Sequence, residues 1–419
     1  MNIVWTKVYL SIFLSCIIWF LCLNKSKIET TLKLWSLSNV FVLSVLLLRI
    51  VPFILAFFVF DFPKPSDINY YWDHSVPVLD GKVVYRDFFC PYAPLFPYVL
   101  AFSTKLWHDW RVISALMMLA EIGILWLTVR SFKWAYTQEE LLFRTILYLL
   151  MPASMVLSAL SGQEDIWMWF FAVIAYRFSF SKNNSFWFGF VLGTGQLFTK
   201  VILILPTIPI FLLARNRPLF ILGLSIIGVP TLAILYFYTN LEFLQPIQES
   251  NIVRSPNLGS VLNPLLFDSI SLGARAWNWI GLVITSIVAS TTIRHRTDYN
   301  ILAVFSWIWV VTFGTMMVVQ QSAYSNYIFI YLMPLMFSMV NLKSKKEILI
   351  LLIFNFSCVS QPSLWWRMGQ PIYKSPADIF SRIDYTTDYL LQLIIVACVL
   401  YYIYSGFQYL KKSNPITPV

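Results

Sequence analysis

Long apolar runs separated by short polar segments dominate the sequence and limit the folds available to it. A bilayer core of about 30 Å requires about 20 apolar residues per helix. Taken in order, the runs predict about 13 spans, near residues 5–23, 36–59, 111–130, 141–160, 165–180, 186–200, 201–214, 219–238, 273–291, 301–319, 327–341, 347–360 and 387–406. Short runs around Lys200 and after Lys346 could be kinked or paired as half-helices, which would change the number by one or two.

The composition supports a membrane protein. Hydrophobic residues make up 58% of the chain and charged residues only 12%, which is more apolar and less charged than a soluble protein of this length. The sequence therefore predicts an all-α, polytopic bundle of transmembrane helices with outer-face loops and juxtamembrane helices. The net charge of +10 does not indicate nucleic acid, because the basic residues come in twos and threes between apolar runs.

The basic residues predict the sidedness of the bundle, because cytoplasmic loops carry an excess of lysine and arginine. If the polar segment at residues 61–98 is outside, the short cytoplasmic loops and tail hold Lys25, Lys27, Lys33, Arg130, Lys133, Lys182, Arg215, Arg217, Arg294, Arg296, Lys343, Lys345, Lys346, Lys411 and Lys412. This arrangement requires that residues 93–107 do not cross the membrane. We expect them to form a half-buried helix on the outer face.

The segment 61–98 is the one long polar stretch in the first part of the chain, and it carries five aspartates among many aromatic residues. We interpret it as the active-site loop of a membrane enzyme. Asp67 is the candidate base, because it follows a span by a few residues and precedes Tyr70 and Tyr71. An ordinary solvated loop is the alternative.

Two charges lie within predicted spans, where charges are costly and usually have a partner or a function. Arg49 stands in the second run and Glu121 in the third. They could form a buried ion pair that ties two helices together. Alternatively, Arg49 could reach the phosphate of a ligand.

Further polar groups are predicted on the outer side. A tight turn, Ser161-Gly162-Gln163-Glu164-Asp165, directly precedes a span, and acids are favourable at a helix N-terminus. Lys200 stands between two apolar runs, where it could bind a phosphate or simply extend to the interface. Later outer segments contain Arg254, Gln321 and Tyr324.

The order of these features resembles the GT-C class of polyprenyl-phosphate-sugar-dependent glycosyltransferases. The similarity is greatest to bacterial mannosyltransferase-like members and the first mannosyltransferase of GPI-anchor assembly. It covers roughly residues 40–340. The features are, in order, the membrane arginine, the Asp-Tyr loop, Gly81 with Val84-Tyr85, Tyr92-Ala93-Pro94-Leu95, an acid in the next helix, the outer Gly-Gln-x-Asp turn, a lysine before Leu205-Pro206, and a late Gln-x-x-Tyr segment.

The resemblance implies roles for individual residues. Asp67 would be the catalytic base, and Lys200, Arg254 and Arg49 would hold the donor phosphate. The sugar or acceptor would meet Tyr70, Tyr71, Tyr85, Tyr92, Gln163, Glu164, Asp165, Gln321 and Tyr324. No cofactor is certain. A divalent cation is doubtful, because Asn69 stands where the GPI enzyme has the second aspartate of Asp-x-Asp.

The apolar runs and the range of the resemblance divide the chain into three parts, and the resemblance implies a function. Residues 1–35 would be an extra membrane helix with a cytoplasmic loop, and residues 36–341 the catalytic module with outer loop 60–110. Residues 342–419 would be C-terminal helices with outer loop 361–386 and a basic tail. The protein would be an inverting glycosyltransferase, and we expect it in the plasma membrane because the sequence shows no eukaryotic retention signal. On the extracytoplasmic face it would move mannose, or another hexose or pentose, from a polyprenyl-phosphate donor to a glycolipid or glycan acceptor.

Two other classes stay open. A lipid-linked polysaccharide polymerase or ligase would depend on basic residues in late loops, such as Arg367 and Arg382. A polytopic transporter would show internal repeats and charges deep in several spans.

Overall fold

The computed structural model describes residues 3–180, 184–269, 273–295 and 301–411, so Lys182, Arg296 and the basic tail from Lys412 lie outside the described residues. The elements in these ranges are all helices, joined by turns and loops, and the described residues contain no β-strand, only one isolated bridge between Val84 and Phe88. The first half contains α1 (Ile3–Leu23), α2 (Lys25–Leu32), α3 (Leu37–Val45), η1 (Leu46–Ile50), α4 (Val51–Ile54), η2 (Leu55–Val59), α5 (Ser66–Leu79), α6 (Phe96–Leu106), α7 (Arg111–Ser131), α8 (Gln138–Leu150), α9 (Pro152–Ser154), η3 (Met155–Leu160), α10 (Trp167–Phe180), α11 (Ser185–Phe198), η4 (Val201–Leu203) and α12 (Ile204–Leu213).

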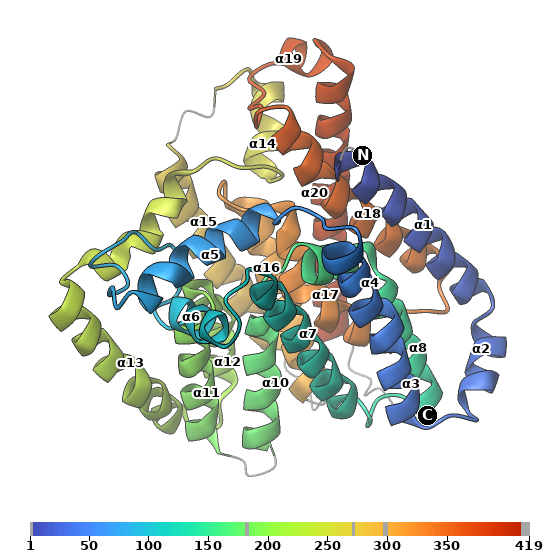
Figure 1. Cartoon of the computed structure of the whole chain (residues 1–419), viewed down its shortest axis with the longest axis horizontal. Helices are drawn as coiled ribbons and strands as arrows, with labels where there is room; N and C mark the ends of the chain where they lie inside the picture. Colours follow the sequence, from blue (N-terminus) through green and yellow to red (C-terminus); the bar gives the residue numbers. More distant parts are fainter. Residues whose placement is uncertain (1–2, 181–183, 270–272, 296–300, 412–419) are drawn as a thin grey trace.

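The second half contains the remaining helices. They are α13 (Arg217–Thr239), η5 (Glu242–Asn251), α14 (Leu258–Leu262), η6 (Asn263–Leu266), α15 (Ala274–Thr291), η7 (Thr292–His295), α16 (Ile301–Val319), η8 (Ser325–Tyr327), α17 (Ile328–Ser338), α18 (Lys345–Arg367), α19 (Pro376–Phe380) and α20 (Ile383–Lys411). In Figure 1, α14 and α19 lie toward the top of the molecule, whereas α2 lies lower, at one side.

Seven helices in the described part of the chain are long and apolar enough to cross a membrane. They are α1, the continuous helix of residues 37–59, α7, α13, α16, α18 and α20. An eighth span results if α8 and the following residues 152–160 count as one, although they are bent by 58°. The bend falls where Met151 leaves the helical conformation before Pro152, as expected because proline disfavours a helical residue before it. The chain is therefore an α-helical, multi-pass membrane protein.

Every predicted apolar run forms a helix, but several are too short to cross a bilayer as straight spans. The runs predicted at 165–180, 186–200, 201–214 and 327–341 correspond to α10, α11, α12 and α17, which have 14, 14, 10 and 11 residues. A rise of about 1.5 Å per residue makes them shorter than the hydrocarbon core. The count of 13 spans thus stays a prediction.

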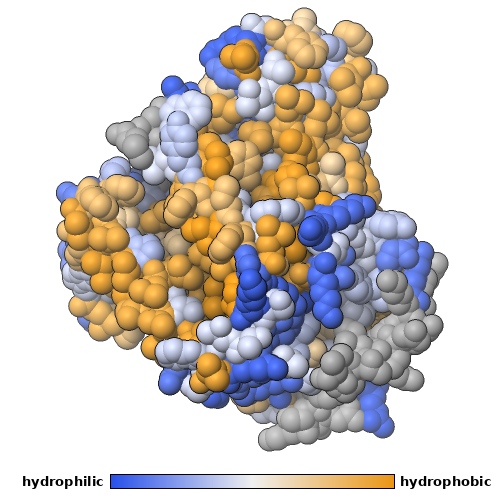
Figure 2. Space-filling model, turned by 90° about the vertical axis from the view of Figure 1, so that its right-hand side faces the viewer, coloured by the Kyte–Doolittle hydropathy of each residue, from blue (hydrophilic) through white to orange (hydrophobic). Residues whose placement is uncertain are grey.

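The centre of the molecule is built around α16 and α17. Every residue of α17 is buried, and Trp307 and Trp309 of α16 are fully enclosed. In contrast, peripheral helices expose large apolar side chains, such as Phe237 of α13 with 81% of its surface accessible. Figure 2 shows apolar residues forming a broad surface over the upper part of one side of the molecule, with hydrophilic residues gathered lower down. Exposed apolar surface of this extent indicates contact with lipid.

The polar segment 61–98 is not a loop throughout, as the sequence suggests, because its residues Ser66–Leu79 form α5. Pro65 precedes the first turn in an extended conformation, and Asp67 lies in that turn, where the partial positive charge of a helix N-terminus favours an acid. The helix expected within residues 93–107 is α6, which packs on α5 and α7 and is not among the span-forming helices. Figure 1 shows α5 and α6 lying together against the bundle.

Candidate functional site

The candidate site forms where the start of α5 meets the turn between η3 and α10, and a glycine permits this close approach. Gly162 has a φ of +66°, which is unfavourable for other residues. A Cβ atom at this position would lie 2.3 Å from Cδ1 of Ile68, the residue after Asp67. A side chain at residue 162 would therefore force the buried Ile68 side chain to move, in addition to the backbone strain.

Asp67 is joined to the turn by a side-chain hydrogen bond. The amide nitrogen of Gln163 donates to the Asp67 carboxylate. The amide oxygen of Gln163 in turn accepts from Asn326 Nδ2 at 3.2 Å. One turn further along α5, the Tyr71 hydroxyl donates to the Glu164 carboxylate. Four residues predicted for the site from separate parts of the chain therefore meet.

Lys200 closes the same cluster from the start of η4. Its Nζ lies 2.5 Å from Asp165 Oδ1 and 2.9 Å from Glu164 Oε1, and both carboxylates are almost completely buried. The ammonium group also lies 5.3 Å from the centre of the Tyr327 ring. Lys200 thus belongs to the cluster, as expected, but its ammonium group is already paired with two carboxylates.

The surroundings of Asp67, and its burial above all, favour the protonated form of its carboxyl. Burial raises the pKa of the Asp67 carboxyl, and the negative charge of Glu164 raises it further. The positive charges of Lys7 and Lys200, together with the hydrogen bond from Gln163, act in the opposite direction. A carboxylate whose pKa lies above the usual range is better matched to proton abstraction near neutral pH.

Arg254 forms a second cationic part beside this cluster. Its guanidinium carbon lies 4.4 Å from the centre of the Tyr324 ring, and its Nη2 lies 2.8 Å from Glu249 Oε2. The backbone N–H of Arg254 donates to the Gln321 carbonyl at 2.7 Å. Among the described residues, its buried Nε has no hydrogen-bond acceptor. Unlike Lys200, Arg254 thus retains a donor that no described residue satisfies, although this atom is itself buried.

Tyr324 connects the two parts electrostatically. Burial raises its pKa to about 12, against the positive charge of Arg254, and the negative charge of Asp67 also raises it. The charges of Arg254 and Asp67 therefore both act on the Tyr324 hydroxyl. The predicted role of Gln321 is less direct, because its backbone carbonyl binds Arg254 and Asn257.

The other predicted tyrosines pack beside α5. The Tyr92 ring contacts the rings of Tyr71 and Tyr70 at centroid distances of 5.4 Å and 5.9 Å. Tyr70 is partly exposed, whereas the buried Tyr85 donates its hydroxyl to the Tyr92 carbonyl at 2.5 Å. Tyr70 could thus meet a ligand, and Tyr85 holds the position of Tyr92.

Arg49 does not reach this cluster, and the predicted phosphate contact requires correction. Its Nε lies 2.7 Å from Glu121 Oε2, and neither side chain is exposed. The other N–H groups donate to Glu121, Ser154 and the carbonyls of Leu48 and Leu149. All five donors of the guanidinium are then used. Arg49 forms the buried ion pair that the sequence offered as its other interpretation.

Possible metal ligands do not gather among the residues that the structure describes, where no group of three or more His, Cys, Asp or Glu side chains is placed to hold a metal ion. Asn69 directs its amide to Asp73 Oδ2 at 3.4 Å, and not to Asp67. The doubtful divalent cation therefore gains no support from the arrangement of these carboxylates.

Sequence reasoning missed three residues of the site. Lys7 acts on Asp67 although it belongs to α1, which the sequence suggests is a local addition. Asn326 and Tyr327 were within a polar segment already chosen for Gln321 and Tyr324, but no pattern distinguished them. A single lysine at the outer end of the first span was the available signal for Lys7.

Asp67 is not among the residues that line two hollows in the described part of the chain. One, of about 500 Å³, runs along α15 and is lined by residues from Trp279 to Thr291. Trp279, at one end of this hollow, follows Asn278 in the chain. The amide nitrogen of Asn278 donates to the Ser250 carbonyl at 2.6 Å, and Ser250 lies four residues before Arg254. The other lies at the end of α1.

Comparison with known proteins does not assign the chain to a family. No family model matches the sequence, and no curated protein matches it significantly. The class that the fold defines is therefore a multi-pass helical membrane protein with a buried carboxylate and lysine cluster.

Proposed function

We propose that this protein is an integral-membrane inverting glycosyltransferase that uses a polyprenyl-phosphate sugar as donor. The observation that supports this most is the cluster around Asp67, in which a carboxylate with a raised pKa lies beside hydrogen-bonding amides, tyrosines and cations. Sugars bind through hydroxyl groups and apolar ring faces, so amides, carboxylates and aromatic rings suit them. The resemblance to the GT-C class supports the same assignment.

In this proposal Asp67 removes the proton of an acceptor hydroxyl as its oxygen attacks the anomeric carbon of the donor. The bond between that carbon and the phosphate oxygen breaks, and a single in-line displacement inverts the configuration. The proton passes to Asp67, and the leaving phosphate departs as an anion without a general acid. Gln163 orients the carboxylate of Asp67 through its hydrogen bond.

In this proposal Arg254 is the main cation that binds the donor phosphate. Its Nε has no acceptor among the described residues, and the neighbouring Tyr324 supports the guanidinium plane. Positive charge at this position stabilises the leaving group. Lys200 could contribute only by giving up part of its contact with Glu164 and Asp165. The hollow along α15 offers an apolar surface for the lipid chain. The start of α15 lies beside the segment that precedes Arg254, because the Asn278 amide donates to the Ser250 carbonyl.

The acceptor is a glycolipid or a glycan, and the reaction takes place on the extracytoplasmic face of the plasma membrane. The test reconstitutes the purified protein in vesicles with a polyprenyl-phosphate hexose or pentose and candidate acceptors. Mass spectrometry then follows the release of polyprenyl phosphate and the gain of one sugar on the acceptor. Release without transfer, or no reaction with any of these donors, would count against the proposal.

A transporter is the second candidate, because the Arg49–Glu121 pair lies deep within two spans. However, all the N–H groups of Arg49 are bonded within the protein, which leaves no free donor for a passing solute. Flux of a labelled sugar phosphate across sealed vesicles in the absence of any acceptor would favour the transporter. A lipid-linked polymerase or ligase would instead lose activity when Arg367 or Arg382 is replaced.

A further inference from the structure

A second site is built at the opposite end of α1 from Lys7. A hollow of about 400 Å³ lies where the end of α1 and the start of α2 meet the start of α18. Trp19 and Leu23 of α1 and Ile348 of α18 form apolar walls. Because α1 and α18 are both long enough to span a membrane, the hollow lies at the end of two spans. Lipid headgroups occupy this level of a bilayer, where tryptophan is also enriched.

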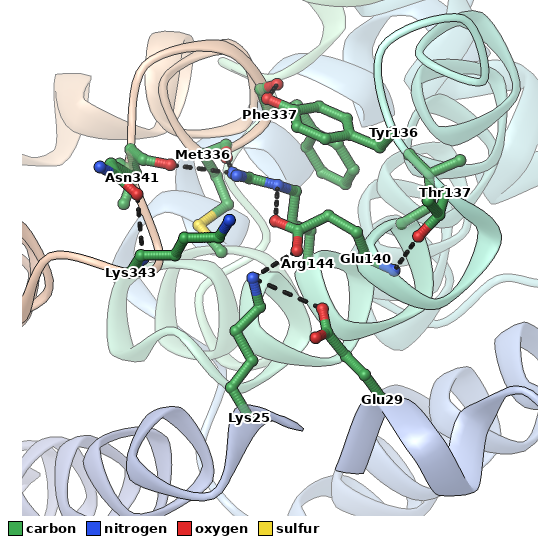
Figure 3. Close-up of polar contacts among 12 residues, drawn as sticks. Lys25, Glu29, Tyr136, Thr137, Glu140, Arg144, Met336, Phe337, Asn341 and Lys343 are labelled. Carbon is green, nitrogen blue, oxygen red and sulfur yellow. Dashed lines mark hydrogen bonds and ion pairs between the residues drawn. The ribbon is translucent and has the colours of Figure 1, made fainter. Parts of the chain in front are cut away.

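The acids beside this hollow are already matched by cations (Figure 3). Lys25 Nζ binds the Glu140 carboxylate and lies 3.4 Å from Glu29 Oε1. On the other side, Arg144 Nε donates to Glu140 Oε1 at 2.9 Å, and its Nη1 donates to the Met336 carbonyl at 2.6 Å. Two carboxylates and two cations thus balance one another. Any further lysine at the hollow adds uncompensated positive charge.

Two further lysines line the hollow. Neither Lys343 nor Lys345 has a carboxylate within ion-pair distance among the described residues, and both are exposed. Figure 3 shows the Lys343 side chain extending toward the cluster of Lys25 and Arg144. The acid that follows in sequence, Glu347, accepts a hydrogen bond from the Asn341 backbone at 2.7 Å. The N-terminal end of α18 adds a partial positive charge at the same place.

We propose that this hollow binds the phosphate headgroup of an anionic phospholipid. Lys343 and Lys345 would contact the phosphate, and the acyl chains would lie against Trp19, Leu23 and Ile348. Basic pockets between the ends of transmembrane helices on the cytoplasmic side recognise such headgroups. The predicted sidedness places these lysines on that side. A free phosphate would use only the cations and leave the apolar walls without a ligand. The proposal does not depend on the enzymatic function.

The experiment compares two lipids on the whole purified protein in a mild detergent. Phosphatidylglycerol or phosphatidylcholine with identical acyl chains is titrated, and native mass spectrometry measures bound lipid. The proposal expects tighter retention of phosphatidylglycerol. The double variant Lys343→Gln, Lys345→Gln should weaken it about 30-fold, because each lysine near an anionic lipid contributes about a factor of five. The matched control, Lys33→Gln with Lys133→Gln, removes the same charge from exposed positions that do not line the hollow.

Three outcomes would overturn the proposal. They are equal retention of the two lipids by the unaltered protein, equal weakening by the control pair, or full displacement of phosphatidylglycerol by millimolar inorganic phosphate. The last outcome would assign the site to a free anion. If the double variant does not fold, the lipid comparison on the unaltered protein still decides the question. Restored retention in the Lys343→Arg, Lys345→Arg variant would support the proposal, since that variant keeps both charges.

Discussion

The side-chain amide of Gln163 donates a hydrogen bond to the carboxylate of Asp67, across a sequence separation of 96 residues. This bond joins the turn before α10 to the first turn of α5. It fixes the direction of the carboxylate while one oxygen remains outside the bond. The position of Gln163 depends on the turn at Gly162, so the geometry of Asp67 depends on that glycine.

Replacement of Gly162 by alanine should damage both stability and activity. The new Cβ would lie 2.3 Å from Ile68 Cδ1, and the φ of +66° disfavours alanine. Overpacking and backbone strain together should lower the free energy of unfolding by about 2–4 kcal/mol. Thermal unfolding in detergent measures this loss. Gly123→Ala is the control, because nothing lies within 4 Å of its added Cβ and alanine favours the helix interior. Equal behaviour of the two variants would contradict the close approach.

The Arg49–Glu121 pair should behave as a structural unit. Arg49→Met alone leaves a buried carboxylate without its partner and should destabilise the protein by about 3–5 kcal/mol. The double variant Arg49→Met, Glu121→Met should recover much of that stability, because no buried charge remains. Unfolding temperature and sugar transfer are measured for both. A double variant that is stable yet inactive would instead support a direct role of Arg49 at the donor phosphate.

The pH dependence of sugar transfer should reflect Asp67. Its pKa is raised above the ordinary 3.8 by burial and by Glu164, and the base must be deprotonated to act. Activity should therefore be lost as the pH falls through a value above 3.8. The folded protein also binds this proton more strongly than the unfolded chain, so this group makes the protein more stable as the pH drops through the raised pKa toward 3.8.

The charge of Glu164 provides a second test of whether Asp67 is the group that titrates in the pH–rate profile. Glu164→Gln removes one of the two causes of the raised pKa, so the acid side of the pH–rate profile should move to lower pH. Glu249→Gln serves as the control, because Glu249 pairs with Arg254 and is not among the charges that act on Asp67. A profile that shifts equally in both variants would mean that another group titrates.

The helices were largely predictable from the sequence, because apolar runs and proline positions are local signals. The predicted run at 141–160, for example, is recovered as α8 and the residues after Pro152, but the 58° bend between them was not. The number of membrane spans could not be predicted from the pattern of apolar runs either. A short helix such as α12, with 10 residues, gives the same apolar signal as part of a true span.

The membership of the site was partly predictable, but its pairings were not. Asp67, Gln163 and Lys200 were identified from a polar segment, a polar turn and a single lysine on the outer side of apolar runs. Their contacts depend on how distant helices pack, which residue spacing does not determine. For the same reason Lys7 was missed, although its charge acts on Asp67. Arg49 shows the opposite case, a residue assigned to the site that does not belong to it. It was assigned to the donor phosphate, but its buried side chain is paired with Glu121 of α7.

The central claim is that the carboxylate of Asp67 acts as a base in sugar transfer. The most direct measurement is the transfer rate of Asp67→Asn in vesicles, compared with Asp73→Asn, which changes an exposed aspartate on the same helix. Asparagine can still accept the hydrogen bond from Gln163, so the fold should be retained. The account predicts a loss of at least about 100-fold for Asp67→Asn and a nearly unchanged rate for Asp73→Asn. A folded Asp67→Asn variant that keeps most of its activity would contradict it.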